Sequence, residues 1–379
     1  MSHQVAVVAM AAHTALGNLD TTWQELCAGK SAIAPLPRFD TTNYLTNLAA
    51  LLPQSSDVSP SHSITLLEHL ATDLGVVPSN TILFGATTKW GIDQLERAGR
   101  QLPYDANALY SATLIEQMRR LWPSKGAGQV FAAACASSTL ALARASATIA
   151  AGRTSSVLVC GVDMCSEFVF SGFSALQGLA PEACRPFCQQ RRGLTLGEGA
   201  AALLLMDAER ACAEGRPTLA TIAGWGVAAD AHHITAPARD GCGLQLACRK
   251  ALAKAACDVS DIDAIHAHGT GTVYNDAMEI TAFHHLFPES LPPIFGVKGA
   301  IGHTLGAAGA IETALSIQCL RNNSLPPTVG VESPMTEAAN AITRQTTPFT
   351  GTTILKTNSG FGGINAALLF KKSEVAHVR

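Results

Sequence analysis

Cys135 has the surroundings of a catalytic nucleophile. It follows a short apolar run, residues 128–131, and precedes an Ala-rich segment whose only charge before Arg153 is Arg144. An apolar run followed by good helix formers predicts that Cys135 lies at the junction of a strand and a helix. A thiol at a helix N-terminus faces unpaired backbone N–H groups, so we expect its pKa to fall and its thiolate to be favoured. Taken alone, the same pattern also fits an inert cysteine in a tightly packed helix.

Two histidines in Gly-rich turns favour the catalytic interpretation. His268 follows a predicted strand, residues 263–267, and begins the sequence His-Gly-Thr-Gly-Thr. Open α/β sheets gather their sites at the carboxyl ends of their strands. His303 lies between Gly302 and Thr304 at the start of a helix of small residues. A helix N-terminus disfavours a cation, so we expect His303 to stay neutral and to donate a hydrogen bond.

A glycine-rich loop near the end of the chain offers further hydrogen-bond donors. Residues 360–363 read Gly-Phe-Gly-Gly, so most of their backbone N–H groups have no bulky side chain beside them. Together with the N–H of Cys135, they can form an oxyanion hole, a set of donors that holds negative charge developing on oxygen. The alternative interpretation is an ordinary tight turn between two edge elements.

The elements that must position these residues alternate between strands and helices. This alternation predicts mostly parallel sheets. The small-residue helices that begin near Cys135 and His303 occupy matching places in the two halves, so we infer an internal duplication with this helix pair at its centre. The charged helix before Pro217 is the best boundary. We therefore divide the chain into residues 1–216, which carry the nucleophile, and residues 217–379, which carry both histidines.

The C-terminal segment is predicted to contain two strands and a long loop. Residues 353–357 and 366–370 are apolar enough to form strands, and residues 358–365 between them are rich in glycine, asparagine and serine. This composition indicates an irregular connection.

Composition excludes several classes of protein. Hydrophobic residues make up 47% of the 379 residues and charged residues 15%, which predicts a large core or an oligomer interface. The net charge of −3 and the absence of a long Lys/Arg run argue against a nucleic-acid partner. The apolar stretch 131–151 is interrupted by serines and an arginine, so we expect a buried helix and no membrane span.

The cysteines indicate a reducing compartment. Eleven cysteines, odd in number and irregularly spaced, do not form the pattern of a disulfide framework. Cys184 and Cys188 are close in sequence, but no second pair of ligands follows at the spacing of a zinc site, so we expect no metal. The N-terminal residues do not match a secretory signal. We therefore expect a cytoplasmic protein.

Four motifs occur in a fixed order along the chain. They are Ala134-Cys135-Ala136-Ser137-Ser138, the sequence from His268 to Thr272, the sequence from Val297 to His303, and Gly360-Phe361-Gly362-Gly363. These motifs resemble, in the same order, those of the β-ketoacyl-acyl carrier protein synthases. The resemblance is to the ketosynthase I/II type, which belongs to the thiolase superfamily and has a Cys-His-His site, and it spans nearly the whole chain. It implies an α/β fold of thiolase type, with duplicated halves in five αβαβα layers.

The resemblance implies a role for each motif residue in a decarboxylative Claisen condensation. Cys135 takes the acyl chain as a thioester, and His268 and His303 assist decarboxylation of a malonyl group. The N–H groups of Cys135 and Phe361 form the oxyanion hole, and Phe361 also gates access to the cysteine. Lys298 organises the histidines.

The remaining implied roles concern support, substrate and partners. Glu312 pairs with the lysine, while Thr270, Thr272, Gly360 and Gly362 line the substrate entrance. No metal or dissociable cofactor is implied, because phosphopantetheine arrives on an acyl carrier protein. The resemblance also implies a homodimer, or a heterodimer with a ketosynthase-like subunit.

Some residues depart from the family pattern, and these departures bear on which biosynthetic pathway the chain serves. Cys188 and Arg192 stand where family members commonly have acidic residues, and the loop that begins at Asn358 is one residue shorter than the usual fatty-acid form. We therefore expect either a type II polyketide or aryl polyene pathway, or fatty acid synthesis.

Two other functions remain as alternatives. A thiolase-like acyltransferase is less well matched, because a biosynthetic thiolase needs a second cysteine near the C-terminus and the last one here is Cys319. A non-catalytic chain-length subunit of a heterodimeric ketosynthase usually lacks the nucleophile, which this chain has.

Overall fold

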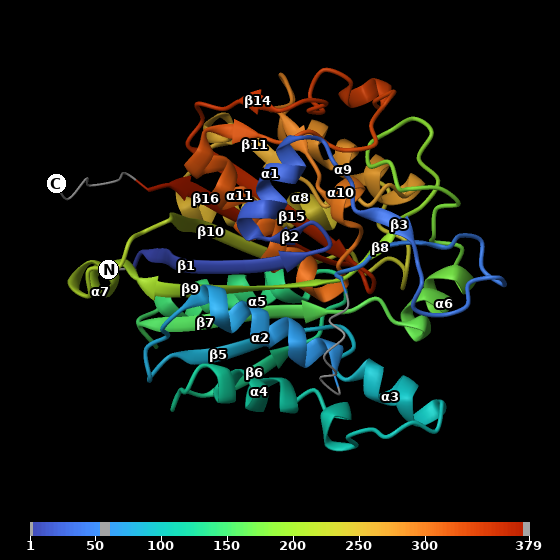
Figure 1. Cartoon of the computed structure of the whole chain (residues 1–379). Coiled ribbons are helices and arrows are strands. Elements are labelled where there is room, and N and C mark those ends of the chain that lie inside the picture. Colours follow the sequence, from blue (N-terminus) through green and yellow to red (C-terminus); the bar gives the residue numbers. More distant parts are fainter. Residues whose placement is uncertain (1–2, 54–60, 374–379) are drawn as a thin grey trace.

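Two similar sets of strands enclose a central pair of helices. The computed structural model describes residues 3–53 and 61–373. The strand order is β6-β5-β7-β9-β1 in the N-terminal set and β10-β16-β15-β11-β12 in the C-terminal set. The two sets meet where β1 pairs with β10 (Figure 1).

The elements have the following bounds. The N-terminal set consists of β1 (Val5–Thr14), β5 (Ile82–Ala86), β6 (Gly128–Phe131), β7 (Ser156–Asp163) and β9 (Gly199–Asp207). The C-terminal set consists of β10 (Ala220–Ala229), β11 (Ala264–His266), β12 (Ile294–Phe295), β15 (Thr353–Gly360) and β16 (Ile364–Lys372). Shorter strands are β2 (Gly17–Asn18), β3 (Ile33–Pro35), β4 (Leu48–Ala50), β8 (Leu196–Gly197), β13 (Ser324–Leu325) and β14 (Thr347–Pro348). The helices are α1 (Leu19–Cys27), α2 (His62–Leu74), α3 (Ile92–Gly99), α4 (Thr113–Leu121), α5 (Ser137–Ala150), α6 (Glu167–Ala175), α7 (Ala208–Ala213), α8 (Cys242–Ala255), α9 (Val273–Leu286), α10 (Lys298–Ile301) and α11 (Ala308–Asn322).

The pairing directions repeat between the two sets. Strand β5 is parallel to β6 and β7, and β11 is parallel to β12 and β15. Strand β9 is antiparallel to both of its neighbours, and so is β16. The repetition agrees with the duplication inferred from the sequence. We propose that the chain divides between these sets, after residue 216.

The expectation of mostly parallel sheets is wrong. Five of the pairings between neighbouring strands in these two sets are antiparallel. Strands β9 and β16 are each antiparallel to two neighbours, and β1 is antiparallel to β10. The clearest cause is the connection from β15 to β16, which is only three residues long. Strands joined by so short a turn must run antiparallel.

The predicted loop 358–365 is also mostly strand. Cross-strand pairing continues from Thr353 with Lys371 to Gly360 with Ile364, so only three residues form the turn. Gly362 and Gly363 have φ angles of +87° and +74°, which favour glycine in this turn. Cross-strand hydrogen bonds thus hold most of this segment as strand, although its composition is typical of a loop.

Helices α5 and α11 form the middle layer of the fold. Both contact strands of the two sets, whereas α2 and α4 cover the N-terminal set from outside and α8 covers the C-terminal set. Strands β7 and β9 are buried at every residue because helices cover both faces. The arrangement has the five αβαβα layers expected from the sequence.

Close approach of the two central helices requires small residues. A Cβ atom added to Gly309 of α11 would lie 2.5 Å from the backbone nitrogen of Thr139 in α5. The hydroxyl of Ser138 donates to the Gly306 carbonyl at 2.6 Å and accepts from the Ala310 N–H at 2.9 Å. These contacts join the start of α5 to the start of α11.

A buried carboxylate ties the segment around β3 and β4 to the core. Glu198 is fully buried and accepts two hydrogen bonds from Arg38, at 2.5 and 2.8 Å. It also accepts from the backbone N–H groups of Leu52 and Cys165, and His62 lies 3.0 Å away. Burial alone would raise the pKa of Glu198, but the hydrogen bonds from Arg38 and His62 lower it to about 2.

We predict that Glu198→Gln will lower the free energy of unfolding by about 3 kcal/mol, because removing one charge leaves Arg38 buried and unpaired. The change is measured as a shift in the urea midpoint at pH 7. A lowered pKa stabilises the fold above the unfolded value of about 4.3, and this contribution is lost as the pH falls toward the folded value. The variant should therefore show weaker acid sensitivity than the wild type.

Glu214→Gln serves as the matched control. Glu214 pairs with Arg210 and Arg216, but its side chain is 33% exposed, so the change should cost less than about 1 kcal/mol. Equal effects of the two substitutions would contradict the role assigned to Glu198.

Candidate active site

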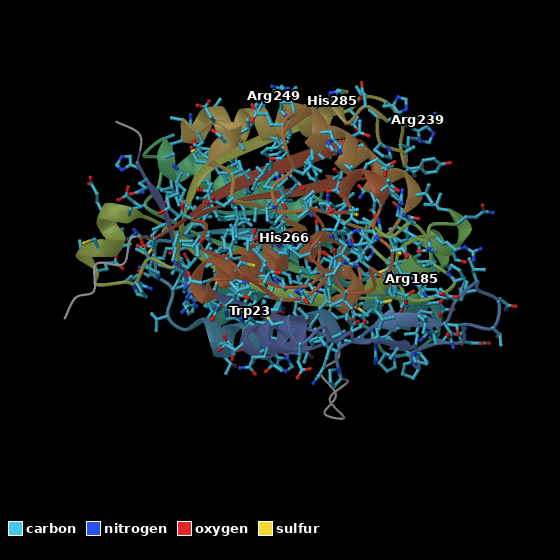
Figure 2. All side chains as sticks on the ribbon, turned by 90° about the horizontal axis from the view of Figure 1, so that it is seen from above. Trp23, Arg185, Arg239, Arg249, His266 and His285 are labelled. Atoms are coloured by element: carbon cyan, nitrogen blue, oxygen red, sulfur yellow. The ribbon has the colours of Figure 1, made fainter. Side chains whose placement is uncertain are left out.

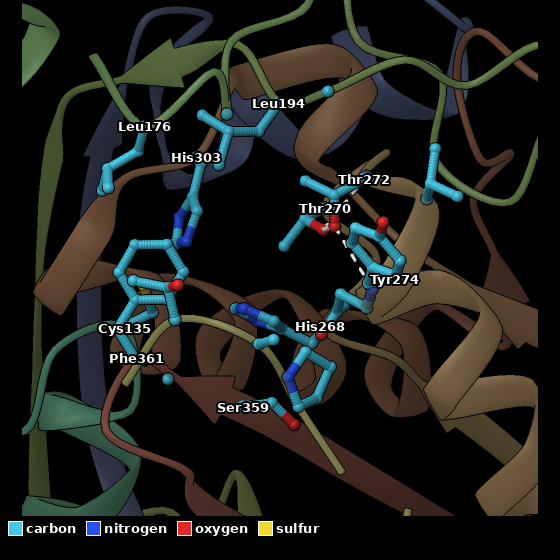
Figure 3. A pocket seen from close by; sticks show the side chains of 18 of the residues that line it. Cys135, Leu176, Leu194, His268, Thr270, Thr272, Tyr274, His303, Ser359 and Phe361 are labelled. Atoms are coloured by element: carbon cyan, nitrogen blue, oxygen red, sulfur yellow. Dashed lines mark hydrogen bonds between the residues drawn. The ribbon is translucent and has the colours of Figure 1, made fainter. Parts of the chain in front are cut away.

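The motif residues converge on one pocket. Its volume is about 300 Å³, and its walls include Cys135, His268, His303 and Phe361. Figure 3 shows these four side chains around a common space, with Phe361 beside Cys135. The residues come from both halves of the chain, so neither half contains the whole pocket.

Cys135 lies in a tight turn between β6 and α5. Ala134, the residue before it, has a φ angle of +46°, which is uncommon for a residue with a side chain. The hydroxyl of Ser137 holds the turn by donating to the Ala134 carbonyl at 2.6 Å and accepting from the Ala133 N–H at 2.8 Å. On its other side, a Cβ atom added to Gly360 would lie 3.2 Å from the Cys135 nitrogen. Gly360 thus lets β15 pack directly against the turn.

The expected lowering of the Cys135 pKa is wrong. Burial raises the pKa of this thiol to about 12, although the charge of Lys298 and a hydrogen bond from the Phe361 N–H oppose the rise. Loss of water around the sulfur outweighs the favourable position before α5. Cys135 therefore rests as a thiol at neutral pH.

The three reactive groups lie close together. The cysteine sulfur and one ring nitrogen of each of His268 and His303 are all within 4.8 Å of one another. The two imidazole rings meet edge to face, with centroids 5.2 Å apart and planes at 82°. All three side chains are buried.

Hydrogen-bond partners assign the same tautomer to both histidines. The Leu305 N–H donates to Nδ1 of His303 at 3.2 Å, and the Asn358 amide donates to Nδ1 of His268 at 2.8 Å. Because each Nδ1 accepts, the proton of each neutral ring is on Nε2. Within the described part of the chain, Nε2 of His303 has no partner. These tautomers suit hydrogen-bond donation rather than metal ligation, which needs a free lone pair on nitrogen.

Both histidines are neutral at physiological pH. Burial lowers the pKa of His303 to about 3, with a further contribution from the charge of Lys298. Burial and the same lysine also hold the pKa of His268 well below its usual value. His303 is therefore neutral, as expected, but chiefly because of burial rather than the helix end.

Lys298 and Glu312 form the pair expected from the sequence, and a second lysine joins it. The ammonium of Lys298 donates to Glu312 and to the His268 carbonyl, the latter at 2.5 Å. The ammonium of Lys356 lies 3.3 Å from the other oxygen of Glu312. Burial alone would raise the pKa of Glu312, but the two lysines lower it to about 2.

Lys356 and Asn358 were missed as site residues by the sequence analysis. The only sequence signal for Lys356 was a charged residue inside the predicted strand 353–357. Asn358 lay in the predicted loop and received no role. Both side chains are fully buried on β15.

Two acidic side chains of α9 hold the loop after His268, and these were also missed. Glu279 accepts from the backbone N–H groups of His268 and Gly269 at 2.7 and 2.8 Å. Asp276 accepts from the N–H groups of Thr270 and Gly271. Their spacing on a helix directly after the Gly-Thr motif was an available signal.

Three of the four predicted substrate-binding residues line the pocket, and Gly362 does not. Thr270 and Thr272 line the pocket, with their hydroxyl oxygens 2.9 Å apart (Figure 3). Gly360 also lines it, and Gly363 does so in place of Gly362. The N–H of Gly362 instead donates to the Ile234 carbonyl at 2.7 Å.

The pocket mouth is largely apolar. Leu176, Val273 and Tyr274 are among its lining residues, and each is more than half exposed. The ring of Phe361 packs against Phe173, with centroids 5.6 Å apart. Arg192, one of the departures from the family pattern, also lines the pocket.

In residues 3–53 and 61–373, none of the helices combines the length and the apolar character needed to cross a bilayer.

Comparisons with known proteins agree with this geometry. The family profile described as "Beta-ketoacyl synthase, N-terminal domain" matches residues 106–211, and "Beta-ketoacyl synthase, C-terminal domain" matches residues 219–332. "Nodulation protein E" of Rhizobium meliloti (strain 1021) is 32% identical, over 98% of this chain and 100% of its own. "3-oxoacyl-[acyl-carrier-protein] synthase 2" of Staphylococcus aureus (strain COL) is 29% identical, over 98% of this chain and 99% of its own.

A solved structure titled "The ishigamide ketosynthase/chain length factor" has a similar fold. Its TM-score is 0.90 at 25% sequence identity, over 98% of this chain and 100% of that one. The matching profiles, the relatives along the full chain and the shared fold lead to one conclusion. The chain belongs to the beta-ketoacyl synthase family of thiolase-like condensing enzymes, which are acyltransferases.

Proposed function

We propose that this chain elongates acyl chains by decarboxylative Claisen condensation, with Cys135 as the acyl-carrying nucleophile. The observation that carries the proposal is a buried thiol within 4.8 Å of two imidazole nitrogens. The hydrogen bonds at each Nδ1 leave Nε2–H as the donor of both rings. Such a site can hold an acyl group and stabilise negative charge on a second thioester.

In the first step, the Cys135 sulfur attacks the carbonyl of an acyl thioester. The C–S bond to the incoming carrier breaks, and the thiol proton passes to the departing carrier thiolate. The N–H groups of Cys135 and Phe361 hold the tetrahedral oxyanion. The hydrogen bond between the Phe361 N–H and the cysteine sulfur supports this role, because it places the donor beside the reacting atom.

In the second step, a malonyl thioester binds in the place of the departed carrier. His268 and His303 donate through Nε2–H to its thioester oxygen. Breaking the C–C bond to the carboxylate releases CO2 and leaves the electron pair as an enolate, whose charge the two donors hold. Neutral imidazoles suit this work, because each keeps a proton to donate.

In the third step, the enolate carbon attacks the acyl carbonyl on Cys135. A new C–C bond forms, and the C–S bond to the cysteine breaks. The product is a β-ketoacyl thioester on the carrier, two carbons longer, and the cysteine thiolate takes up one proton from water.

The proposed reaction also assigns roles in substrate delivery. An acyl carrier protein would bring both thioesters on phosphopantetheine, which would pass Thr270 and Thr272 to reach the cysteine, with Phe361 as the gate. Gly360 and Gly362 would shape the turn beside it, and no dissociable cofactor is required.

We further propose an assembly of two subunits, either a homodimer or a heterodimer with a ketosynthase-like partner. The similar structure titled as a ketosynthase/chain length factor supports the second form. The eleven cysteines, which are all free thiols, suit a reducing compartment such as the cytoplasm. The pathway would be fatty acid, polyketide or aryl polyene synthesis. The intact Cys-His-His set disfavours a non-catalytic chain-length subunit.

We predict that wild-type protein incubated with acyl-carrier proteins of several chain types will gain one acyl group on Cys135. Adding malonyl-carrier should then discharge the adduct as a β-ketoacyl product. Cys135→Ala should form no adduct, whereas Cys248→Ala should behave as the wild type, because Cys248 is buried in α8. Intact-protein mass spectrometry measures the adducts. If no donor acylates the wild type, alone or with a co-purified partner, a chain-length subunit becomes the better assignment.

We predict that His303→Ala and His268→Ala will separate the two half-reactions. Loss of one donor should slow CO2 release from malonyl-carrier by about 10²-fold or more, because the enolate oxygen loses one of its two hydrogen-bond donors. Acylation of Cys135 should change much less. Parallel measurement of acyl adducts and released CO2 tests this, and an equal loss in both steps would show that the histidines act elsewhere in the reaction.

A further inference from the structure

A second buried lysine lies behind the catalytic histidines, on the inner face of the C-terminal strand set. Strand register pairs Lys356 of β15 with His266 of β11. Alternate residues share a face, so Asn358 lies on the same side as Lys356. All three side chains are fully buried, and Figure 2 shows His266 deep in the interior. A charge in such a place is costly and calls for a reason.

Lys356 makes three polar contacts. Its ammonium donates to the Thr139 hydroxyl of α5 at 2.7 Å and to the amide oxygen of Asn358. It lies 3.3 Å from Glu312 of α11. Glu312 is already paired with Lys298, so one carboxylate faces two ammonium groups. Lys356 is therefore not needed to neutralise Glu312.

The contact with Asn358 has a consequence for His268. An ammonium can only donate, so the amide oxygen of Asn358 must face Lys356. The amide nitrogen then points the other way and donates to Nδ1 of His268 and to Glu312, both at 2.8 Å. Lys298 also approaches Nδ1 of His268, at 3.1 Å. With Nδ1 accepting, the His268 proton stays on Nε2.

We propose that Lys356 is a positioning residue, which acts through Asn358 to hold His268 in the tautomer that donates to the enolate oxygen. This inference rests on the proposed function. It assigns to Lys356 a part in the decarboxylation step and none in the acylation of Cys135, because the network reaches His268 rather than the sulfur.

Lys356 gains and loses its charge within the pH range in which the reaction can be assayed. Burial lowers its pKa to about 8, with Lys298 adding to the fall and Glu312 and Glu279 opposing it. Below this pH the ammonium is present and the amide is oriented; above it the orientation is weakened. Of the other groups around it, His266 and His268 titrate at much lower pH, and the pKa of Glu279 is raised to about 7 by burial.

The test compares wild type, Lys356→Met and Ser316→Ala across the range from about pH 7.5 to about 9.5. Ser316 bonds to His266 in the same buried region but has no hydrogen bond to Lys356 or Asn358 among the described contacts. CO2 release is measured on enzyme already acylated at Cys135, and acylation is measured separately. Melting temperatures verify folding, and Lys356→Arg provides a cation that does not titrate in this range.

We expect CO2 release by the wild type and Ser316→Ala to fall as the pH rises through the Lys356 pKa. CO2 release by Lys356→Met should be about tenfold slower than that of the wild type at the lower end of the pH range, because one charged hydrogen bond is lost. Its rate should change little with pH. Lys356→Arg should exceed Lys356→Met at the upper end. A wild-type pH profile in Lys356→Met would overturn the proposal.

A double-mutant cycle tests the route through Asn358. If Lys356 acts through it, Lys356→Met should add little to the loss caused by Asn358→Ala. Fully multiplicative losses would overturn the proposal. Failure of the wild type to acylate Cys135 would instead count against the proposed function, so the two failures are distinguishable.

Discussion

The site depends on the close contact of α5 with α11. Gly309 removes the side chain that would separate them, and Ser138 bridges their first turns through two hydrogen bonds. Cys135 lies just before α5, separated from it by Ala136, and His303 precedes α11 with the 3-10 turn Leu305–Ala307 in between. A nucleophile from one half and a hydrogen-bond donor from the other therefore meet only because the helices meet. A Cβ atom at position 309 would collide with Thr139, so the two helices could not keep this contact.

Burial at this helix junction also sets the protonation states. Away from water, the thiol keeps its proton and each imidazole stays neutral with one ring proton, since each charged form is disfavoured. The buried charged groups Lys298, Glu312 and Lys356 do not line the pocket. They are stabilised by pairing with one another, which leaves neutral donors at the pocket surface. This separation suits a reaction in which negative charge appears only transiently on oxygen.

Much of the fold was predictable, because its signals are local. The alternation of strands and helices, the matching small-residue helices and the order of the four motifs all indicated a duplicated α/β fold. Pairing direction was not predictable in the same way. The segment 358–365 has the composition of a loop, but its ends are held as strands by partners across the hairpin. Hydrogen bonds across the hairpin, which composition does not record, decide this case.

The sequence by itself determined which residues carry the chemistry: one cysteine and two histidines in small-residue turns, with Lys298 in a neighbouring motif. Tertiary structure decided how they behave. Desolvation reversed the expected shift of the Cys135 pKa, because a local helix end is weaker than the loss of surrounding water. Strand register placed Lys356 and Asn358 behind His268, although nothing in their own segment pointed to that neighbour. Burial and register are properties of the assembled sheets, so no local pattern records them.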